Sequence, residues 1–286
     1  MKKIKYFLEF IFVYSLLFIF KVIGYRNASN LGEKIGILLG PLFRSKIKII
    51  NNLKNSNIGN SDSDREILIR RMWGNYGRIL AEYPFLEKFK KKIFKKYIKI
   101  EGTEYLEEIK KNKQKVVFVS GHFNNFELMA MHIENSGLEV AAIYRPLNNI
   151  FLNTIMENIR LNHICKKQIK KGKAGTKELL KLFKNGYSIA LMIDQRVSEG
   201  IKSNFFNRPA LTTTIPAQLV KKYNIQVVPI YIERKDKIYF KMYINKPIIF
   251  DKNKSLDEIT SDLNKNLEKM ILKNPDQWIW SHDRWK

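Results

Sequence analysis

The chain has 286 residues, and 45% of them are hydrophobic, which is enough for one large domain with a sizeable core and excludes a wholly disordered protein. Lysine and arginine number 52 against 27 acidic residues, so the formal net charge is +25. Such an excess favours an anionic partner such as nucleic acid, acidic lipid or an acidic carrier protein, although solvated helix faces account for part of it. Cys165 is the only cysteine, which excludes an intramolecular disulfide and a cysteine-based zinc site.

The first predicted element is an apolar helix near the N-terminus, within IKYFLEFIFVYSLLFIF at residues 4–20. Its uncharged part covers only residues 10–20, whereas a spanning helix needs about 20 apolar residues. Lysines flank the segment, and Lys5 and Glu9 are spaced to pair on one helix face. We expect residues 1–26 to form a membrane-anchoring helix that either crosses the bilayer or lies in its interface. A cleaved signal peptide and a buried core helix are the alternatives.

The next predicted elements, between residues 30 and 100, are helices. Apolar residues recur at helical spacing on both sides of a break at Gly40 and Pro41, and a second helix begins after the Ser and Asp residues near position 61. The segment LEKFKKKIFKKYIKI, residues 86–100, mixes lysine with aromatic and aliphatic side chains. It is expected to be a basic amphipathic helix, either on a membrane surface or simply solvated.

From residue 116 onward, short apolar runs alternate with amphipathic segments. The expected strands are VVFVS at 116–120, LEVAAIY at 138–144, YSIALMI at 187–193, IQVVPIYI at 225–232 and KIYFKMYIN at 237–245. The expected helices are 126–135, 150–164, 175–186, 212–224 and 255–274. This alternation predicts an α/β fold with a mixed, mostly parallel central sheet covered by helices.

The stretch SGHFNNFE, residues 120–127, follows the first of these strands. In α/β folds ligands collect outside the carboxyl ends of the strands, and this is where His122 is expected. Glu127, five residues later at a helix start, could orient the imidazole and leave the other ring nitrogen as a base. The nearby residues contain no nucleophile elbow, so a His-Glu pair of this kind suits deprotonation of a substrate hydroxyl. Helix capping by His122 is the structural alternative.

A metal site is a weaker interpretation of the same residues. His132 extends the pattern to H-x4-E-x4-H. Side chains on one helix converge at spacings of three or four, and the zincin pattern H-E-x-x-H is absent. No metal and no cofactor are therefore expected.

Several stretches together resemble a known family. GHFNNFE resembles the first block of the late acyltransferases of lipid A biosynthesis, the lauroyl/myristoyl transferase family, where the form is close to GH-aromatic-G-N-W-E. YRPLNN at 144–149 resembles a second block. MIDQRVSEGIKSNFFNRPALTTTIPAQLVKKYNIQVVPIYI and NPDQWIWSHDRWK resemble later blocks in order and spacing. The departures are Asn125, Phe126 and Asn207, which bear on acceptor choice more than on the reaction.

The resemblance implies transfer of a fatty acyl group from acyl carrier protein to a hydroxyl of a lipid A precursor of the Kdo-lipid IVA type. It also implies a place at the cytoplasmic face of the inner membrane, with residues 27–286 as the catalytic domain. His122 would deprotonate the acceptor hydroxyl and Glu127 would orient His122. The reaction needs no covalent acyl-enzyme, so Cys165 is assigned no role.

Other residues are assigned to substrate binding. Arg145 and Arg160 are candidates for phosphate of the acceptor or of the carrier's phosphopantetheine, because guanidinium binds phosphate in a bidentate manner. Asp194, at the end of the strand at 187–193, is expected to position an arginine or the acceptor. Arg208 and Arg284 are weaker phosphate candidates. His132, His163 and His282 are expected to have structural roles.

Two other functions remain as alternatives. One is acyl transfer to a different lipid, such as a lysophospholipid or glycolipid. The other is a non-catalytic basic protein that binds membrane or nucleic acid, which the net charge and the segment 86–100 favour; no usual nucleic-acid-binding motif is found. The expected partners are acyl carrier protein, the lipid A precursor and an anionic membrane, but not nucleic acid.

Overall fold

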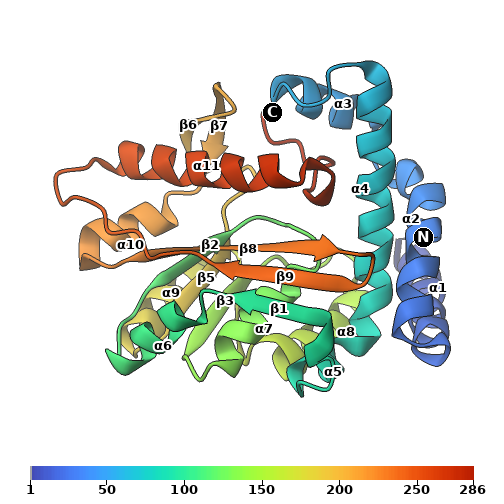
Figure 1. Ribbon diagram of the computed structural model, residues 1–286, viewed down its shortest axis with the longest axis horizontal. Helices are drawn as coiled ribbons and strands as arrows, with labels where there is room; N and C mark the ends of the chain where they lie inside the picture. Colours follow the sequence, from blue (N-terminus) through green and yellow to red (C-terminus); the bar gives the residue numbers. More distant parts are fainter. Residues whose placement is uncertain (1) are drawn as a thin grey trace.

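The computed structural model describes residues 2–286 and has a central sheet covered by helices on both faces (Figure 1). The N-terminal third is helical, and its elements are α1 (Lys2–Ile23), α2 (Tyr25–Phe43), α3 (Lys46–Asn55), α4 (Asp62–Glu82), the 3-10 turn η1 (Tyr83–Phe85), α5 (Leu86–Lys90) and the 3-10 turn η2 (Lys95–Tyr97). The strands are β1 (Ile98–Glu101), β2 (Val117–Ser120), β3 (Val140–Tyr144), β4 (Lys167–Lys170), β5 (Ser188–Met192), β6 (Ile201–Phe205), β7 (Arg208–Thr212), β8 (Val227–Lys235) and β9 (Tyr239–Ile244). The remaining helical elements are α6 (Thr103–Lys111), α7 (Glu127–Asn135), α8 (Ile150–Ile159), the π-helical turn η3 (Arg160–Ile164), α9 (Lys173–Lys184), α10 (Ile215–Tyr223), α11 (Leu256–Lys273) and the 3-10 turn η4 (Pro275–Gln277).

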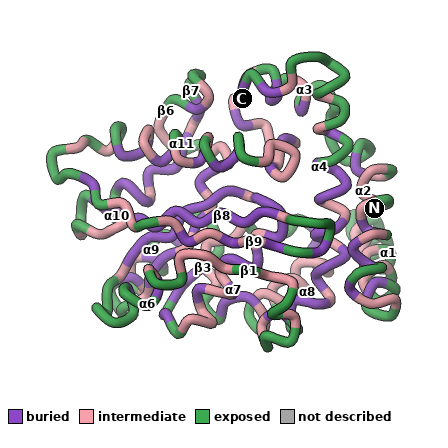
Figure 2. The backbone as a smooth tube through the Cα atoms, in the orientation of Figure 1, coloured by how far each residue is buried: buried purple, intermediate pink, exposed green. Residues whose placement is uncertain are grey.

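The large sheet has seven strands in the order β1-β9-β8-β2-β5-β3-β4. Its neighbours pair in parallel, with the exception of the antiparallel pair β8 and β9. The predicted α/β class with a mixed, mostly parallel sheet is confirmed. In Figure 1, α11 and the β6–β7 hairpin lie on one side of the sheet and α6, α7 and α8 on the other. Strands such as β2 are buried along their whole length, as expected for strands covered on both faces (Figure 2).

The helical layer is built around the close contact of α2 with α4. A Cβ added to Gly32 would lie 2.4 Å from the carbonyl oxygen of Gly77. Glycine at both positions therefore lets the two helix backbones touch, and a side chain at either position would push them apart. The predicted break at Pro41 is not found, because α2 continues to Phe43 and the chain bends only at Arg44 and Ser45.

The prediction of a basic amphipathic helix over residues 86–100 is wrong. The helix α5 ends at Lys90, Lys92 has a positive φ of 60°, and residues 98–101 form strand β1. The aromatic residues of this segment instead surround Tyr25: the ring centroids of Phe89, Phe94 and Tyr97 lie 5.0–5.6 Å from that of Tyr25. The apolar residues of this segment are spaced as in a helix, but their packing against Tyr25 of α2 determines the conformation.

Helix α1 is long and apolar enough to cross a membrane. In its most apolar stretch of 18 residues, only 6% of the residues are buried. It nevertheless contacts α2, α4, η1 and α8 along its length. The predicted division into an anchor, residues 1–26, and a catalytic domain, residues 27–286, stays a prediction.

Candidate active site

His122 and Asp194 are brought together by the register of two parallel strands. β2 lies beside β5, with Ser120 opposite Met192, and each of the two polar residues lies two positions beyond this pair. The Asp194 Oδ1 atom lies 2.8 Å from His122 Nδ1, and the backbone N–H of His122 donates to Asp194 Oδ2 at 2.7 Å. The pair therefore stands at the carboxyl end of the sheet, where α/β folds bind ligands.

The surroundings of Asp194 fix the protonation of the imidazole. Asp194 is fully buried, and Trp278 Nε1 donates to its Oδ2 at 2.8 Å. Burial disfavours both charges, but the mutual attraction of the two groups outweighs it, so the pKa of His122 is raised and the pKa of Asp194 is lowered. Because a carboxylate only accepts hydrogen bonds, the proton is on Nδ1, and Nε2 remains available as a base.

Glu127 does not make the hydrogen bond predicted from the sequence. Its Oε1 atom accepts from the Tyr83 hydroxyl at 2.7 Å and from Arg160 Nε and Nη2 at 3.0 and 2.9 Å. Among the residues that the structure describes, the carboxylate bonded to His122 is that of Asp194. The reason is that α7 begins at Glu127, so its carboxylate faces η1 and η3, whereas β5 delivers Asp194 directly to the histidine.

The ion pair of Glu127 with Arg160 lies close enough to His122 to affect its charge, because Glu127 raises the pKa of His122 and Arg160 lowers it to a smaller extent. The Arg160 guanidinium lies over the Tyr144 ring, 5.5 Å from its centroid. Burial disfavours its charge, but Glu127 outweighs this effect and raises the pKa of Arg160. Arg160 is therefore a permanent cation at this position.

His122, Glu127, Arg160 and Arg145 line one cavity of about 820 Å³. The cavity continues from these polar groups along β2, β3, β5 and α7, where its walls are apolar. This part is lined by Phe118, Met129, Ala130, Ile133, Ala142 and Ile164. The site therefore combines a histidine base, cations and an apolar compartment in one space.

Two of the predicted arginines lie outside this cavity. Arg208 is exposed at the start of β7 in the hairpin, and it does not line the cavity. Arg284 is fully buried, and it donates to the Leu211 carbonyl at 2.8 Å and to Thr212 Oγ1 at 2.7 Å. Arg284 therefore stabilises the fold around β7, and a phosphate-binding role for it is wrong.

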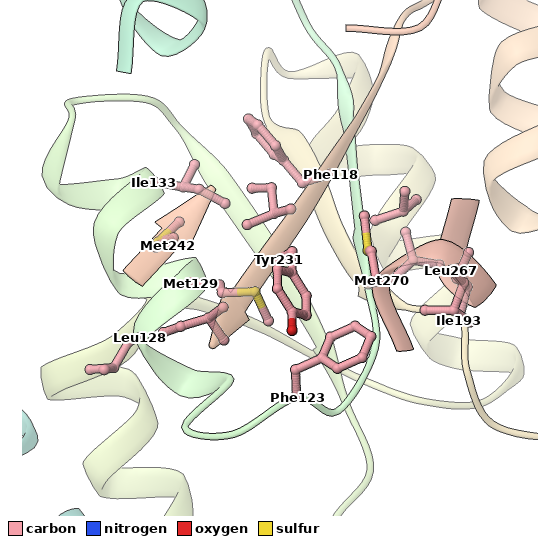
Figure 3. Close-up of a cluster of buried hydrophobic side chains, with 14 of the residues drawn as sticks. Phe118, Phe123, Leu128, Met129, Ile133, Ile193, Tyr231, Met242, Leu267 and Met270 are labelled. Atoms are coloured by element: carbon pink, nitrogen blue, oxygen red, sulfur yellow. The ribbon is translucent and has the colours of Figure 1, made fainter. Parts of the chain in front are cut away.

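The loop after His122 is held from several directions. Phe123 is buried against Tyr231, with ring centroids 5.0 Å apart (Figure 3). Asn124 has a positive φ of 45°, a conformation that asparagine tolerates better than most residues, and its Oδ1 accepts from Arg234 Nε at 2.9 Å. Arg234 in turn binds Glu82 through Nη1 at 2.6 Å and Nη2 at 3.0 Å. This buried ion pair anchors the loop to α4.

Sequence reasoning missed Tyr83 and Trp278, which bind the carboxylates of Glu127 and Asp194. His282 lines the cavity, its Nε2 accepts from the Arg196 backbone N–H at 3.0 Å, and burial lowers its pKa to about 4. The tryptophans and histidine of WIWSHDRWK are the sequence signal that marks this region. Cys165 is buried and burial raises its pKa to about 11, so it is no nucleophile.

Comparison with known proteins decides the family. The family model for bacterial lipid A biosynthesis acyltransferases matches residues 1–286, the whole chain. The chain belongs to this family. It is 25% identical over 257 residues to lipid A biosynthesis acyltransferase 2 of Shigella flexneri. The aligned residues make up 86% of this chain and 80% of that relative. It is 23% identical over 261 residues to lipid A biosynthesis palmitoleoyltransferase of Escherichia coli (strain K12), covering 90% and 84%.

A third relative, lipid A biosynthesis myristoyltransferase of Escherichia coli (strain K12), is 21% identical over 225 residues, covering 77% of this chain and 68% of the relative. The resemblance found in the sequence blocks is therefore confirmed. The acyltransferase class follows from it, and it agrees with a cavity that places a histidine base beside apolar walls.

Proposed function

We propose that the protein transfers a fatty acyl chain from acyl carrier protein to a hydroxyl of a lipid A precursor of the Kdo-lipid IVA type, at the cytoplasmic face of the inner membrane. The observation that carries this proposal is the His122–Asp194 pair, placed at the polar end of a cavity whose deeper walls are apolar. Support also comes from the family to which the chain belongs.

In the proposed reaction, His122 Nε2 takes the proton from the acceptor hydroxyl as the oxygen attacks the thioester carbonyl. Asp194 keeps the proton of the imidazole on Nδ1 and stabilises the imidazolium that forms. When the tetrahedral intermediate collapses, the carbon–sulfur bond breaks and the imidazolium returns its proton to the leaving thiolate. The products are the acylated acceptor and the free thiol of the carrier, and the enzyme is unchanged.

The other cavity residues have supporting roles. Arg160, held by Glu127, presents its guanidinium to the same cavity as His122, where it is available to donate hydrogen bonds to substrate. Arg145 is exposed and lines the cavity, where it is available to bind phosphate of either substrate. The apolar part of the cavity would take the acyl chain, and no bound metal or cofactor is required by these steps.

The test is an assay of the purified chain in detergent, with acyl chains of defined length on acyl carrier protein and a Kdo-lipid IVA type acceptor. We expect transfer, and we expect His122→Ala to lower kcat by about 10²–10⁴-fold, the usual contribution of a general base. His163→Ala is the matched control, because His163 lies in η3 and does not line the cavity. Wild-type turnover in a folded His122→Ala protein would exclude the mechanism.

Parallel assays separate the alternatives. Transfer only to a lysophospholipid or glycolipid acceptor would support the second enzyme function, and transfer only from acyl-coenzyme A would contradict the proposed donor. In cells, deletion of the gene should lower the number of acyl chains on lipid A, measured by mass spectrometry. Binding to nucleic acid that weakens steeply with salt, without acyl transfer, would favour the non-catalytic function.

A further inference from the structure

The bend between α2 and α3 exposes several large apolar side chains that no residue of the described chain covers. Leu38, Leu42, Phe43 and Ile47 are 71–79% exposed. Leu38 and Leu42 lie one helical turn apart on α2, so they point in the same direction. Contiguous exposed apolar residues of this size mark an interaction site rather than ordinary surface.

This bend lies at the mouth of the catalytic cavity. Phe43, Arg44 and Lys48 line the cavity, and so does Leu147, which precedes α8. Leu147 and Ile150 are themselves 40% and 53% exposed. Exposed apolar residues from two separate parts of the chain therefore surround the same opening.

Helix α1 joins this apolar surface through α8. Asn149 Nδ2 donates to the Tyr6 carbonyl at 2.8 Å and to Glu9 Oε2 at 3.2 Å, and the Phe151 ring lies 5.6 Å from the Phe7 ring. At the other end of α1, Phe20 is 1% exposed. Both ends of the helix are therefore fixed to the rest of the protein, and Figure 2 shows exposed stretches along α1 and α2 at one edge of the molecule.

These contacts disagree with a helix that crosses the bilayer. A helix of 22 residues is about 33 Å long, close to the thickness of the hydrocarbon core. If α1 crossed, Tyr6 and Glu9 would lie far from a domain on one side of the membrane, and their hydrogen bonds to Asn149 would break. The outward side chains of α1 are apolar over one face, which suits a helix lying in the interface. They include Ile4, Leu8, Ile11, Phe18 and Val22.

The charge of this region suits an anionic lipid surface. Arg44, Lys46 and Lys48 are exposed around the bend, with Glu66 bonded to Lys46 and Asp283 to Lys48 in exposed ion pairs. Lysines also flank both ends of α1, and the whole chain carries +25. Cationic residues beside an exposed apolar surface add to membrane binding when the lipid is anionic.

We propose that the α2–α3 bend inserts into the headgroup region of an anionic phospholipid membrane beside the cavity mouth, with α1 lying in the plane of the same surface. The cavity then opens directly onto the lipid, so an acceptor lipid enters from the membrane. Only this last consequence rests on the proposed function; membrane binding itself does not require acyl transfer.

The test uses the full chain with Cys165→Ala, which removes the only native cysteine, and single cysteines labelled with the polarity-sensitive fluorophore NBD. Leu42→Cys is compared with Ile249→Cys, because the two side chains are 79% and 76% exposed. Ile249 lies in the segment between β9 and α11, and Figure 1 shows this segment at the end of the molecule away from α2 and α3. With vesicles of phosphatidylcholine and phosphatidylglycerol, we expect a blue shift and a several-fold intensity increase at residue 42 and no change at residue 249. Equal responses at both positions, or none at residue 42, would overturn the proposal.

Depth measurements along α1 test its orientation. NBD is attached to the single cysteine of Ile4→Cys, Phe12→Cys or Val22→Cys. If the helix lies flat, a lipid with its spin label near the headgroup should quench the three fluorophores to a similar extent. A spanning helix would instead place Phe12 near the bilayer centre and the two ends near the surfaces, and this result would overturn the in-plane arrangement.

A functional arm separates this proposal from the proposed reaction. Leu42→Glu should weaken binding to the same vesicles by about tenfold, roughly the contribution of one buried leucine, whereas Ile249→Glu should not. Both variants should keep wild-type acyl transfer to detergent-solubilised acceptor, because neither residue lines the cavity. Loss of vesicle binding with activity retained supports the membrane surface, and unchanged vesicle binding for Leu42→Glu contradicts it whatever the activity.

Discussion

The two carboxylates beside His122 differ in how they reach the site. Glu127 is five residues from the histidine in the sequence, yet it binds Arg160 and Tyr83. Asp194 is 72 residues away, yet it is bonded to both the ring and the backbone of His122. Proximity along the chain therefore says little about which acid acts on a base, whereas the register of neighbouring strands decides it.

The comparison predicts unequal effects of removing the two charges, and the larger is expected for Asp194→Asn. The amide can donate to Nδ1, which forces the imidazole proton onto Nε2 and removes the base. We expect kcat to fall by about 10²–10⁴-fold. Thermal unfolding should first show that the variant is folded at the assay temperature. Altering the hydrogen bonds of a buried group lowers the free energy of unfolding by about 1–3 kcal/mol.

The same variant should change the pH profile. The Asp194 carboxylate raises the pKa of His122, so the unprotonated base is lost in the wild type as the pH falls through that raised value. In Asp194→Asn the carboxylate is gone while burial still disfavours the imidazolium. The acidic limb of kcat/KM against pH should therefore move to lower pH. An unmoved limb with near wild-type kcat would mean that Asp194 does not act on His122.

A smaller effect is expected for Glu127→Gln. The change keeps the side-chain volume but removes the ion pair with Arg160, and we expect kcat/KM to fall by roughly 10–100-fold, since each tenfold step is about 1.4 kcal/mol. The acidic limb should move less than in Asp194→Asn. If Glu127→Gln instead produced the larger pH shift, the dyad predicted from the sequence would be right and the roles of the two carboxylates would be exchanged.

The smallest effects on the kinetic constants are expected for two arginines. Arg145 lines the cavity, and Arg208 lies in the β6–β7 hairpin. Arg145→Ala should raise KM by roughly tenfold with kcat little changed, because a hydrogen bond to a charged group contributes about 1.5 kcal/mol. Arg208→Ala is its matched control and should leave both constants unchanged, since Arg208 is exposed and does not line the cavity. A raised KM in Arg208→Ala alone would place the phosphate contact at the hairpin.

Much of the fold could be predicted because its signals are local. The runs at 116–120 and 187–193 are largely apolar, as expected for strands covered on both faces, and they form β2 and β5. The segment 86–100 could not be predicted in this way. Its spacing fits a helix, but the contacts of Phe89, Phe94 and Tyr97 with Tyr25 form only when α2 is in place.

The sequence by itself determined the α/β class, the position of His122 at a strand end, the family and the apolar character of the first helix. These properties depend on patterns within short stretches of chain. The tertiary structure decided which acid serves His122, because β5 is inserted between β2 and β3 in space although it follows β3 in the sequence. Contacts that depend on strand order and register join residues from distant stretches, and no local pattern specifies them.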